Sequence, residues 1–214
     1  MIEKQINANV YGESSIFTLR FYNEEDLPWL KTYFEAWKAL QMCSCMEAVN
    51  DEGLYHDERS PNIPEAISET LYCMLTTSGR YYKPNVKKNK QRNINKKYKT
   101  EKLEDRSFDA FDILNESTVQ VKASQMEYDC TSFGPKTRQD KIMFIDFFNG
   151  GNIDGTVDVY EIPGELITDV VVCKKDEITF EDRKKEGKRP RFSLKRFVIE
   201  PNNIEPIYKS VKLW

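Results

Sequence analysis

The sequence FDAFDILNESTVQVKAS, residues 108–124, decides the fold. Two runs of apolar and β-branched residues flank residues 115–117, whose polar sequence favours a turn, so we predict a β-hairpin. Residues two apart in a strand point to the same side, and Gln120 and Lys122 should therefore share one face. Folding back at the turn brings Asp109 alongside them. An acid, an amide and an ammonium group are thus expected to meet at one point.

This trio of side chains suits the hydrolysis of a phosphodiester bond. Carboxylate and amide oxygens can hold Mg²⁺, which neutralises charge on the reacting phosphate and acidifies a water molecule, while a lysine positions or stabilises the nucleophile. Asp112 lies three residues after Asp109, so in a regular strand it should point to the opposite face. The alternative is an ordinary exposed pair of strands, whose polar side chains simply face water.

The pattern of apolar residues on either side of the hairpin predicts helices and further strands. Residues 24–49 repeat apolar side chains at three- and four-residue steps, as an amphipathic helix does. A second helix should start at Pro64, because proline suits the first helical turn. This second helix is expected over residues 63–76. The expected strands are residues 16–22, residues 140–148 and residues 156–162, and a turn at residues 12–14 should precede the first of them. Residues 165–172 fit either a helix or a strand.

Length and composition limit the possible classes of protein. The chain has 214 residues, of which 39% are hydrophobic and 12% aromatic, enough for one globular domain with a sizeable core. No run of about 18 apolar residues is present, and the N-terminus lacks the basic start and apolar stretch of a signal peptide. We therefore expect no membrane span and a cytoplasmic protein.

Cysteine and histidine usage argues against a disulfide framework and against a zinc site. The chain has five cysteines, no CxxC pair and one histidine. We expect reduced thiols packed in the core. His56 falls in a polar loop without an orienting partner near it in the sequence, so a loop residue is preferred to a catalytic one. The cysteines are Cys43, Cys45, Cys73, Cys130 and Cys173.

Basic residues are concentrated in two runs, although the net charge is −3. Residues 83–99 hold eight basic residues and no acid, and residues 183–196 hold eight against Glu186 alone. Such surfaces can attract phosphate. Tyr81, Tyr82 and Tyr98 accompany the first run, as stacking residues do in proteins that bind single strands. A solvated loop and a solvated helix face are the alternatives.

The hairpin also carries a pattern that resembles a known superfamily. SFDAF at residues 107–111, followed eleven residues after Asp109 by Gln120-Val121-Lys122, resembles the signature of PD-(D/E)xK nucleases in a QxK variant. Three further stretches are similar to type II restriction endonucleases of that superfamily, in the same order. They are NIPEAISETLYC (62–73), TSFGPKTRQDKIMFIDF (131–147) and GKRPRFSL (187–194), whereas the first 60 residues show no recognisable similarity.

The resemblance implies an α/β (α+β) fold with an αβββαβ core, a mixed central sheet flanked by helices, in a single domain. An extension at residues 1–60 would precede a catalytic core at about 62–165 and a basic element at 183–214. It also implies a role for each residue of the pattern. Asp109 would be the principal Mg²⁺ ligand, Gln120 would take the place of the second acid, and the Val121 carbonyl would add a ligand. Lys122 would be the catalytic lysine. Glu69, with Glu65 behind it, would be an auxiliary helix acid.

The sequence departs from the family at Gln120, because a neutral amide binds Mg²⁺ more weakly than a carboxylate. The number of metal ions and their affinity are therefore open, and Glu69 is the residue that could restore the missing charge.

The function that follows is Mg²⁺-dependent, site-specific cleavage of double-stranded DNA by a bacterial type II restriction endonuclease. A homodimer reading a short palindrome is expected, with residues 29–43 as its interface or, alternatively, as monomer core. A less specific repair nuclease and a non-catalytic nucleic-acid-binding protein remain alternatives. The recognition sequence cannot be read from the residues. The expected DNA contacts are Lys87, Lys88, Lys90, Arg92, Lys136, Arg138, Arg189 and Arg191.

Overall fold

The computed structural model describes residues 1–47, 62–76, 78–81, 108–173 and 175–213, and, for residues 43–47, the backbone alone. In that part of the chain, no helix combines the length and the apolar character that a membrane span needs. The helices are α1 (Leu27–Glu47), α2 (Glu65–Leu75) and α4 (Phe180–Lys185), with the helical turns η1 (Glu24–Asp26), η2 (Gly164–Ile167) and η3 (Lys195–Ile199). The strands are β1 (Ile2–Val10), β2 (Glu13–Phe21), β3 (Gly79–Tyr81), β4 (Ala110–Asp112), β5 (Ser117–Ser124), β6 (Thr131–Ser132), β7 (Lys141–Asp146), β8 (Thr156–Pro163), β9 (Val171–Cys173), β10 (Ile178–Thr179), β11 (Arg191–Phe192) and β12 (Tyr208–Lys212).

A mixed sheet forms the centre of the protein, in the order β1-β2-β3-β4-β5-β7-β8-β12. Its pairs are antiparallel except for β5 and β7, which run parallel. The predicted fold class, a mixed central sheet flanked by helices, is confirmed. The two predicted helices and the predicted strands are also present. Residues 165–172, which fitted either state, divide between η2 and β9.

The predicted hairpin is formed by β4 and β5. Ala110 pairs with Val119 and Asp112 pairs with Ser117, so the turn occupies residues 113–116. Glu116 has a φ of 46°. Since Ser117 already belongs to β5, the prediction that the turn lies at 115–117 was two residues too late at its start.

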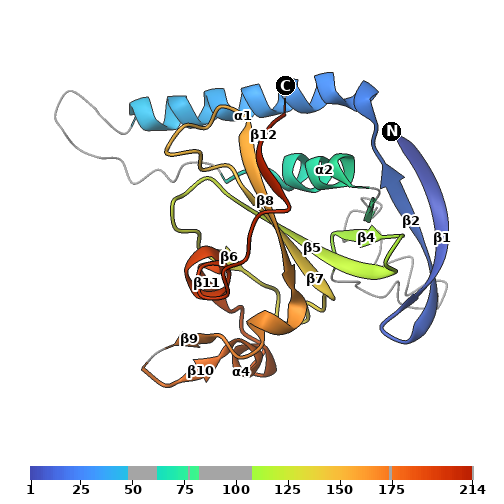
Figure 1. Cartoon of the computed structure of the whole chain (residues 1–214), viewed down its shortest axis with the longest axis vertical. Helices are drawn as coiled ribbons and strands as arrows, with labels where there is room; N and C mark the ends of the chain where they lie inside the picture. The colour runs from blue at the N-terminus through green and yellow to red at the C-terminus, as the bar shows by residue number, and fades with distance from the viewer. Residues whose placement is uncertain (48–61, 77, 82–107, 174, 214) are drawn as a thin grey trace, which may run out of the picture.

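Each face of the sheet packs into its own hydrophobic core. On one face, Val119, Val121 and Met143 pack against α1 and α2, through residues such as Phe34 and Leu71. The opposite face packs against β6, β11, α4 and η3, with Ile142, Phe144, Phe133, Phe192 and Val198 as members of that core. In Figure 1, α1 and α2 lie together at one end of the molecule, and β9, β10 and α4 lie at the other. The alternation of β5 between its two faces is the one that the sequence predicted.

The connection between the parallel strands β5 and β7 differs from the core that the resemblance implied. Parallel neighbours need a crossover, which is usually a helix. Here residues 125–140 make the crossover and contain the short strand β6 but no helix. β6 pairs with β11 near the C-terminus, and this pair covers the face where the second helix of an αβββαβ core was expected.

The N-terminal strands belong to the same sheet as the hairpin. β1 and β2 pair along their full length, with Tyr11 and Gly12 at positive φ between them. β2 then pairs with β3, where Leu19 lies opposite Tyr81. Gly79 permits this approach, since a Cβ there would lie 2.7 Å from the Leu19 Cβ. The predicted turn at residues 12–14 is therefore one residue earlier, because Glu13 and Ser14 already belong to β2.

A buried carboxylate, that of Asp129, ties the C-terminal element to the core. It accepts hydrogen bonds from the Ser193 hydroxyl at 2.8 Å and from the main-chain amides of Leu194 and Lys195 at 2.9 and 3.1 Å. The Thr131 hydroxyl donates to it as well. These bonds satisfy the free amides at the start of η3 and hold that turn against β6.

Replacing Asp129 by Ala should lower the free energy of unfolding by about 3 kcal/mol, because several buried donors lose their acceptor at once. Urea unfolding followed by circular dichroism measures the loss. Asp169→Ala is the matched control, since Asp169 is exposed. A loss no larger than that of the control would show that Asp129 does not hold the C-terminal element.

Candidate active site

The candidate site lies where the hairpin strands stop pairing. The amide of Asp109 still donates to the Val119 carbonyl at 2.9 Å. Two residues further along β5, the Val121 amide donates at 3.0 Å to the side-chain carboxylate of Asp109 instead of to a main-chain carbonyl. The Gln120 amide also donates to that carboxylate. Asp109 and Gln120 are therefore brought together, as the sequence predicted.

A pocket of about 410 Å³ opens at this point. Lys122 reaches it from β5, and its Nζ lies 5.2 Å from the centre of the Phe133 ring. An ammonium over the face of a ring is attracted by the ring's quadrupole. The pocket walls come from α2 (Glu65, Ser68 and Glu69), from the hairpin (Asp109, Gln120, Val121 and Lys122) and from residues 129–132.

The helix acid of the pattern also lines the pocket, with a partner that the sequence did not reveal. Glu69 is buried on α2, and its Oε2 lies 2.6 Å from the Nε of Arg80 on β3. Glu65, one turn earlier on the helix, is exposed at the rim. Four acids therefore line the pocket: Asp109 and Glu69 at the fork, Glu65 at the rim, and Asp129, whose carboxylate already accepts hydrogen bonds from Ser193 and Leu194.

The charges in the pocket act on one another. Burial and the neighbouring charge of Asp109 together raise the pKa of the Glu69 carboxyl to about 7, although Arg80 opposes both. Burial lowers the pKa of the Lys122 ammonium, and the acids Asp109, Glu65 and Glu69 oppose that effect. A bound cation would relieve the repulsion between Asp109 and Glu69.

The donor set fits a hard divalent cation. Asp109 and Glu69 offer carboxylate oxygens, and Gln120 offers an amide oxygen after a half-turn of its amide group. In an extended strand the main-chain amide and carbonyl of one residue point to the same side. Because the Val121 amide points toward Asp109, the Val121 carbonyl points to the side of β5 on which Asp109 lies. Among the described residues, no three His, Cys, Asp or Glu side chains form a cluster that could hold a metal.

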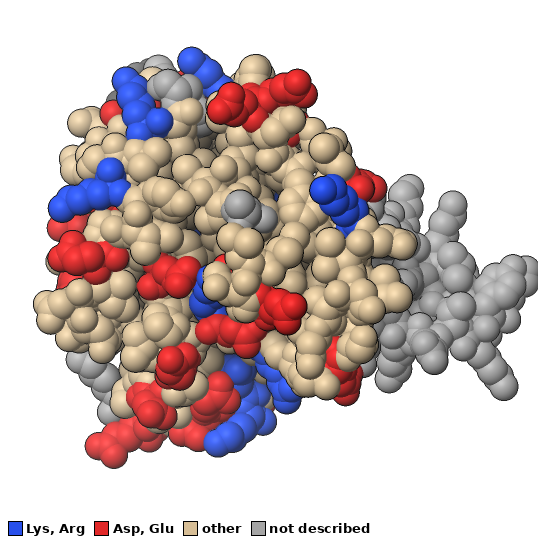
Figure 2. Space-filling view, turned by 45° about the vertical axis from the view of Figure 1, so that its right-hand side comes forward, with Lys and Arg blue, Asp and Glu red and all other residues tan. Residues whose placement is uncertain are grey.

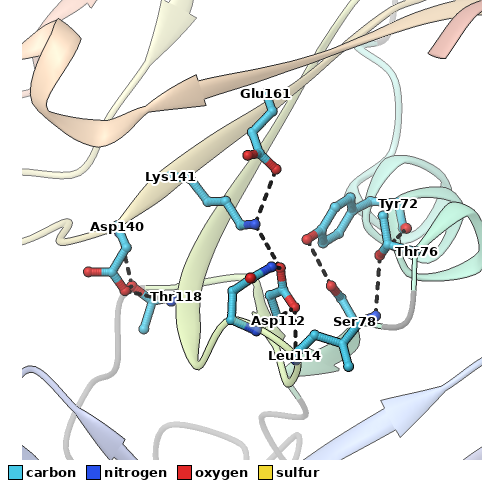
Figure 3. A network of polar contacts seen from close by, with 10 residues as sticks. Tyr72, Thr76, Ser78, Asp112, Leu114, Thr118, Asp140, Lys141 and Glu161 are labelled. Atoms are coloured by element: carbon cyan, nitrogen blue, oxygen red, sulfur yellow. Dashed lines mark hydrogen bonds and ion pairs between the residues drawn. The ribbon is translucent and has the colours of Figure 1, made fainter. Parts of the chain in front are cut away.

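Asp112 takes no part in the pocket, as its spacing from Asp109 predicted. Its Oδ2 lies 2.7 Å from the Nζ of Lys141, which also lies 3.1 Å from Glu161 Oε2 (Figure 3). The amides of Leu114 and Asn115 donate to Asp112 as well, at 3.1 and 3.3 Å. Asp112 thus fixes the hairpin turn to β7 and β8.

The expected DNA contacts are spread over different parts of the molecule. Lys87, Lys88, Lys90 and Arg92 lie outside the described residues, and so do His56 and Tyr82. Lys136 and Arg138 are exposed between β6 and β7 but do not line the pocket, and Arg138 lies over the Tyr11 ring. Arg189 and Arg191 are exposed beside β6.

The second basic run is less positive than its sequence indicated. Four of its cations pair with nearby acids of residues 181–186: Arg183 with Glu186 at 3.2 Å, Lys184 with Glu181 at 2.8 Å, Lys185 with Asp182 at 3.7 Å and Lys188 with Glu186 at 3.0 Å. On the face in Figure 2, basic and acidic side chains are interspersed. For α4, the alternative reading as a solvated helix is the better description.

Two smaller expectations need correction. The expectation of core thiols is right for Cys73, but Cys130 is exposed at the pocket and Cys173 is half-buried. Tyr81 is no exposed stacking residue, because its ring packs 4.9 Å from that of Phe108. Sequence reasoning also missed Arg80 and Asp129, whose partners are distant in the chain and leave no local pattern.

An acid, an amide and a lysine that converge from a strand fork on one pocket of a mixed sheet define the class: a nuclease of the restriction-endonuclease type. The comparisons with known proteins identify the family. The family model described as Bsp6I restriction endonuclease matches residues 22–201, and the chain belongs to that family. It is 29% identical over 154 residues to the type II restriction enzyme Bsp6I of Bacillus sp. (strain RFL6), across 71% of this chain and 73% of that enzyme. No solved structure matches the chain.

Family membership makes this chain a site-specific deoxyribonuclease that acts on double-stranded DNA. Restriction endonucleases generally use a divalent metal ion. The match begins at residue 22 and includes α1, so the expectation of no similarity in the first 60 residues was wrong. The two alternative functions, a non-catalytic binding protein and a less specific nuclease, are excluded by the family.

The raised pKa of Glu69 predicts how the free energy of unfolding depends on pH when a chelator keeps the protein free of metal. The folded state holds the Glu69 proton up to about pH 7, whereas a glutamate with its ordinary value releases it near 4.5. The free energy of unfolding should therefore fall as pH rises between these values, by up to about 3 kcal/mol. Glu69→Gln, which cannot ionise, should lose this dependence.

Urea unfolding at pH 5 and pH 8 measures the effect, and Glu65→Gln on the exposed rim is the matched control. The control should keep the wild-type dependence on pH. If Glu69→Gln keeps it too, the Glu69 proton is not the one that titrates.

Proposed function

We propose that this protein is a Mg²⁺-dependent type II restriction endonuclease that cuts at a short palindrome and uses the pocket at the hairpin fork as its active site. The observation that carries the proposal is the convergence of Asp109, Lys122 and Glu69 on one pocket. Its similarity to an enzyme of a Bacillus strain supports action in the bacterial cytoplasm, where the substrate DNA is found.

Asp109, Glu69, Gln120 and the Val121 carbonyl would hold the cation. Mg²⁺, when bound, neutralises charge on the phosphate and acidifies a water molecule. Asp109 is anchored for this role, because its carboxylate is fixed by the Val121 amide at 3.0 Å. Arg80 holds Glu69 through an ion pair. This pair keeps the Glu69 carboxylate in the pocket, although burial favours the neutral, protonated form of the Glu69 side chain.

Lys122 would act on the nucleophile and the phosphate. Its main chain is fixed in β5 opposite Phe144 of β7, and its ammonium lies over the Phe133 ring, so few orientations remain open to it. A positioned cation beside the reacting phosphate stabilises the negative charge that develops in the transition state. Burial also lowers the pKa of the Lys122 ammonium, which raises the fraction of neutral amine that can accept a proton.

Digestion of a sequenced plasmid in Mg²⁺ tests the function, and discrete fragments with a common end sequence are expected. Asp109→Ala and Lys122→Ala should each lower cleavage at least about 100-fold, since each removes a group that acts on the transition state. Gln120→Glu should keep activity and need less Mg²⁺, because a carboxylate binds the cation more tightly than an amide does.

The matched control for these variants is Lys209→Ala, which removes an exposed lysine outside the pocket and outside the expected DNA contacts. Circular dichroism checks that each variant is folded. Near wild-type cleavage by Asp109→Ala or Lys122→Ala would remove the pocket from the active site.

The outer face of α1 supports a homodimer. Trp29, Tyr33 and Leu40 are 49, 37 and 61% exposed, so apolar side chains lie at the surface along this helix. Trp37 is only 2% exposed, so for this residue the alternative reading as monomer core holds. Two chains related by a twofold axis would supply two active sites and read the two halves of a palindrome.

Light scattering at micromolar concentration should therefore give a mass close to twice 25.1 kDa. Leu40→Glu should shift the equilibrium to the monomer, since burying a charge in an apolar interface is costly. Glu35→Gln, an exposed change on the same helix, is the control. A wild-type monomer that still cuts both strands, with and without DNA present, would contradict the dimer.

A further inference from the structure

β6, which supplies Thr131 and Ser132 to the wall of the pocket, pairs with β11 in a two-stranded ribbon. Ser132 of β6 lines the pocket and pairs with Arg191 of β11. The ribbon is anchored from beneath, because the Phe133 and Phe192 rings stack with their centres 5.7 Å apart. The Phe133 amide also donates to the Pro190 carbonyl at 3.1 Å, which extends the pairing by one residue.

The two arginines of this ribbon lie on its outer face. Pro190 and Phe192 are buried, whereas Arg189 and Arg191 are exposed, as alternation along a strand requires. Residues that pair directly across antiparallel strands have side chains on the same face. Arg191 therefore shares the face of Ser132, and Arg189, two residues before it, does too.

Three features of this face indicate that it receives an anion. Neither Arg189 nor Arg191 forms an ion pair within the described part of the chain, whereas Lys188 beside them pairs with Glu186 at 3.0 Å. The buried hydroxyl of Ser132 also has no hydrogen-bond partner among the described residues. Finally, Arg189 is close enough to Lys122 for its charge to act on that ammonium.

The pocket needs such a charge. Asp109, Glu69 and Asp129 line it and Glu65 stands at its rim, and these acids repel an incoming phosphate. Against them the pocket itself offers Lys122. An arginine can add two parallel N–H donors to the oxygens of one phosphate, a geometry that lysine does not provide.

We propose that Arg189 is a further catalytic residue, which binds the scissile phosphate together with Lys122, while Arg191 and the Ser132 hydroxyl contact the neighbouring phosphate. The inference rests on the proposed active site. In the hydrolysis, a water oxygen bonds to phosphorus, one phosphorus–oxygen ester bond breaks, and the leaving sugar oxygen receives a proton. Arg189 would bind the non-bridging oxygens, where negative charge accumulates as the bonds exchange.

The test removes either partner of the proposed contact. Arg189→Ala and Arg189→Lys are compared with wild type and with Lys185→Ala, a control that removes a 75% exposed charge from the same basic run. Each protein is given a duplex with the mapped site, either unmodified or with a neutral methylphosphonate at the scissile position. Single-turnover cleavage is measured in Mg²⁺ and binding by fluorescence anisotropy in Ca²⁺.

On the unmodified duplex, Arg189→Ala should lower the cleavage rate about 100-fold, with partial recovery in Arg189→Lys. Its binding should weaken about tenfold on the unmodified duplex but match wild type on the methylphosphonate duplex, because the charged partner is already absent. The control should behave as wild type.

Equal losses of binding on both duplexes would place Arg189 on another phosphate and overturn the inference. Normal cleavage by Arg189→Ala would overturn it too. If Lys122→Ala is inactive in that case, the proposed active site stands and only the role of Arg189 fails. If Lys122→Ala cuts normally, the proposed active site itself is wrong. Arg189→Gln serves as a second variant if Arg189→Ala loses its circular dichroism spectrum.

Discussion

The structure depends on one hydrogen bond, that from the Val121 amide to the carboxylate of Asp109. At this point β4 ends while β5 continues beside β7, so an amide of a central strand would lose its partner. A side-chain carboxylate takes the place of the missing carbonyl. The same bond fixes the acid beside Gln120 and Lys122, and the fork between the strands becomes a pocket. The candidate active site therefore begins where the pairing of β4 with β5 ends.

The neutral amide at position 120 changes how charge is distributed around the fork. With a carboxylate there, Asp109, Glu69 and residue 120 would place three acids together at the fork. With glutamine, two remain, and Arg80 compensates one of them at 2.6 Å. Less cation charge is needed to neutralise the site. The pKa of Glu69, raised to about 7 by burial and by Asp109, is the remaining sign of repulsion.

Local patterns account for the part of the site that the sequence could predict. Alternation along one strand placed Gln120 and Lys122 together, and the hairpin turn added Asp109, because all three depend on neighbours in sequence. Arg80 and Asp129 could not be predicted in the same way. Asp129 bonds to Ser193, 64 residues away, and such a contact depends on how β6 meets β11. For the same reason, the sequence did not show that a ribbon would replace the second helix of the core.

The central claim is that Asp109 at the fork holds a divalent cation, and direct metal binding tests it most simply. Mn²⁺ takes the same oxygen ligands as Mg²⁺, and its free concentration can be followed by electron paramagnetic resonance. Mn²⁺ titrated into wild type and the Asp169→Ala control should be bound equally. Asp109→Ala should lose that binding while keeping its circular dichroism spectrum. Equal binding of Mn²⁺ by a folded Asp109→Ala variant would contradict the account.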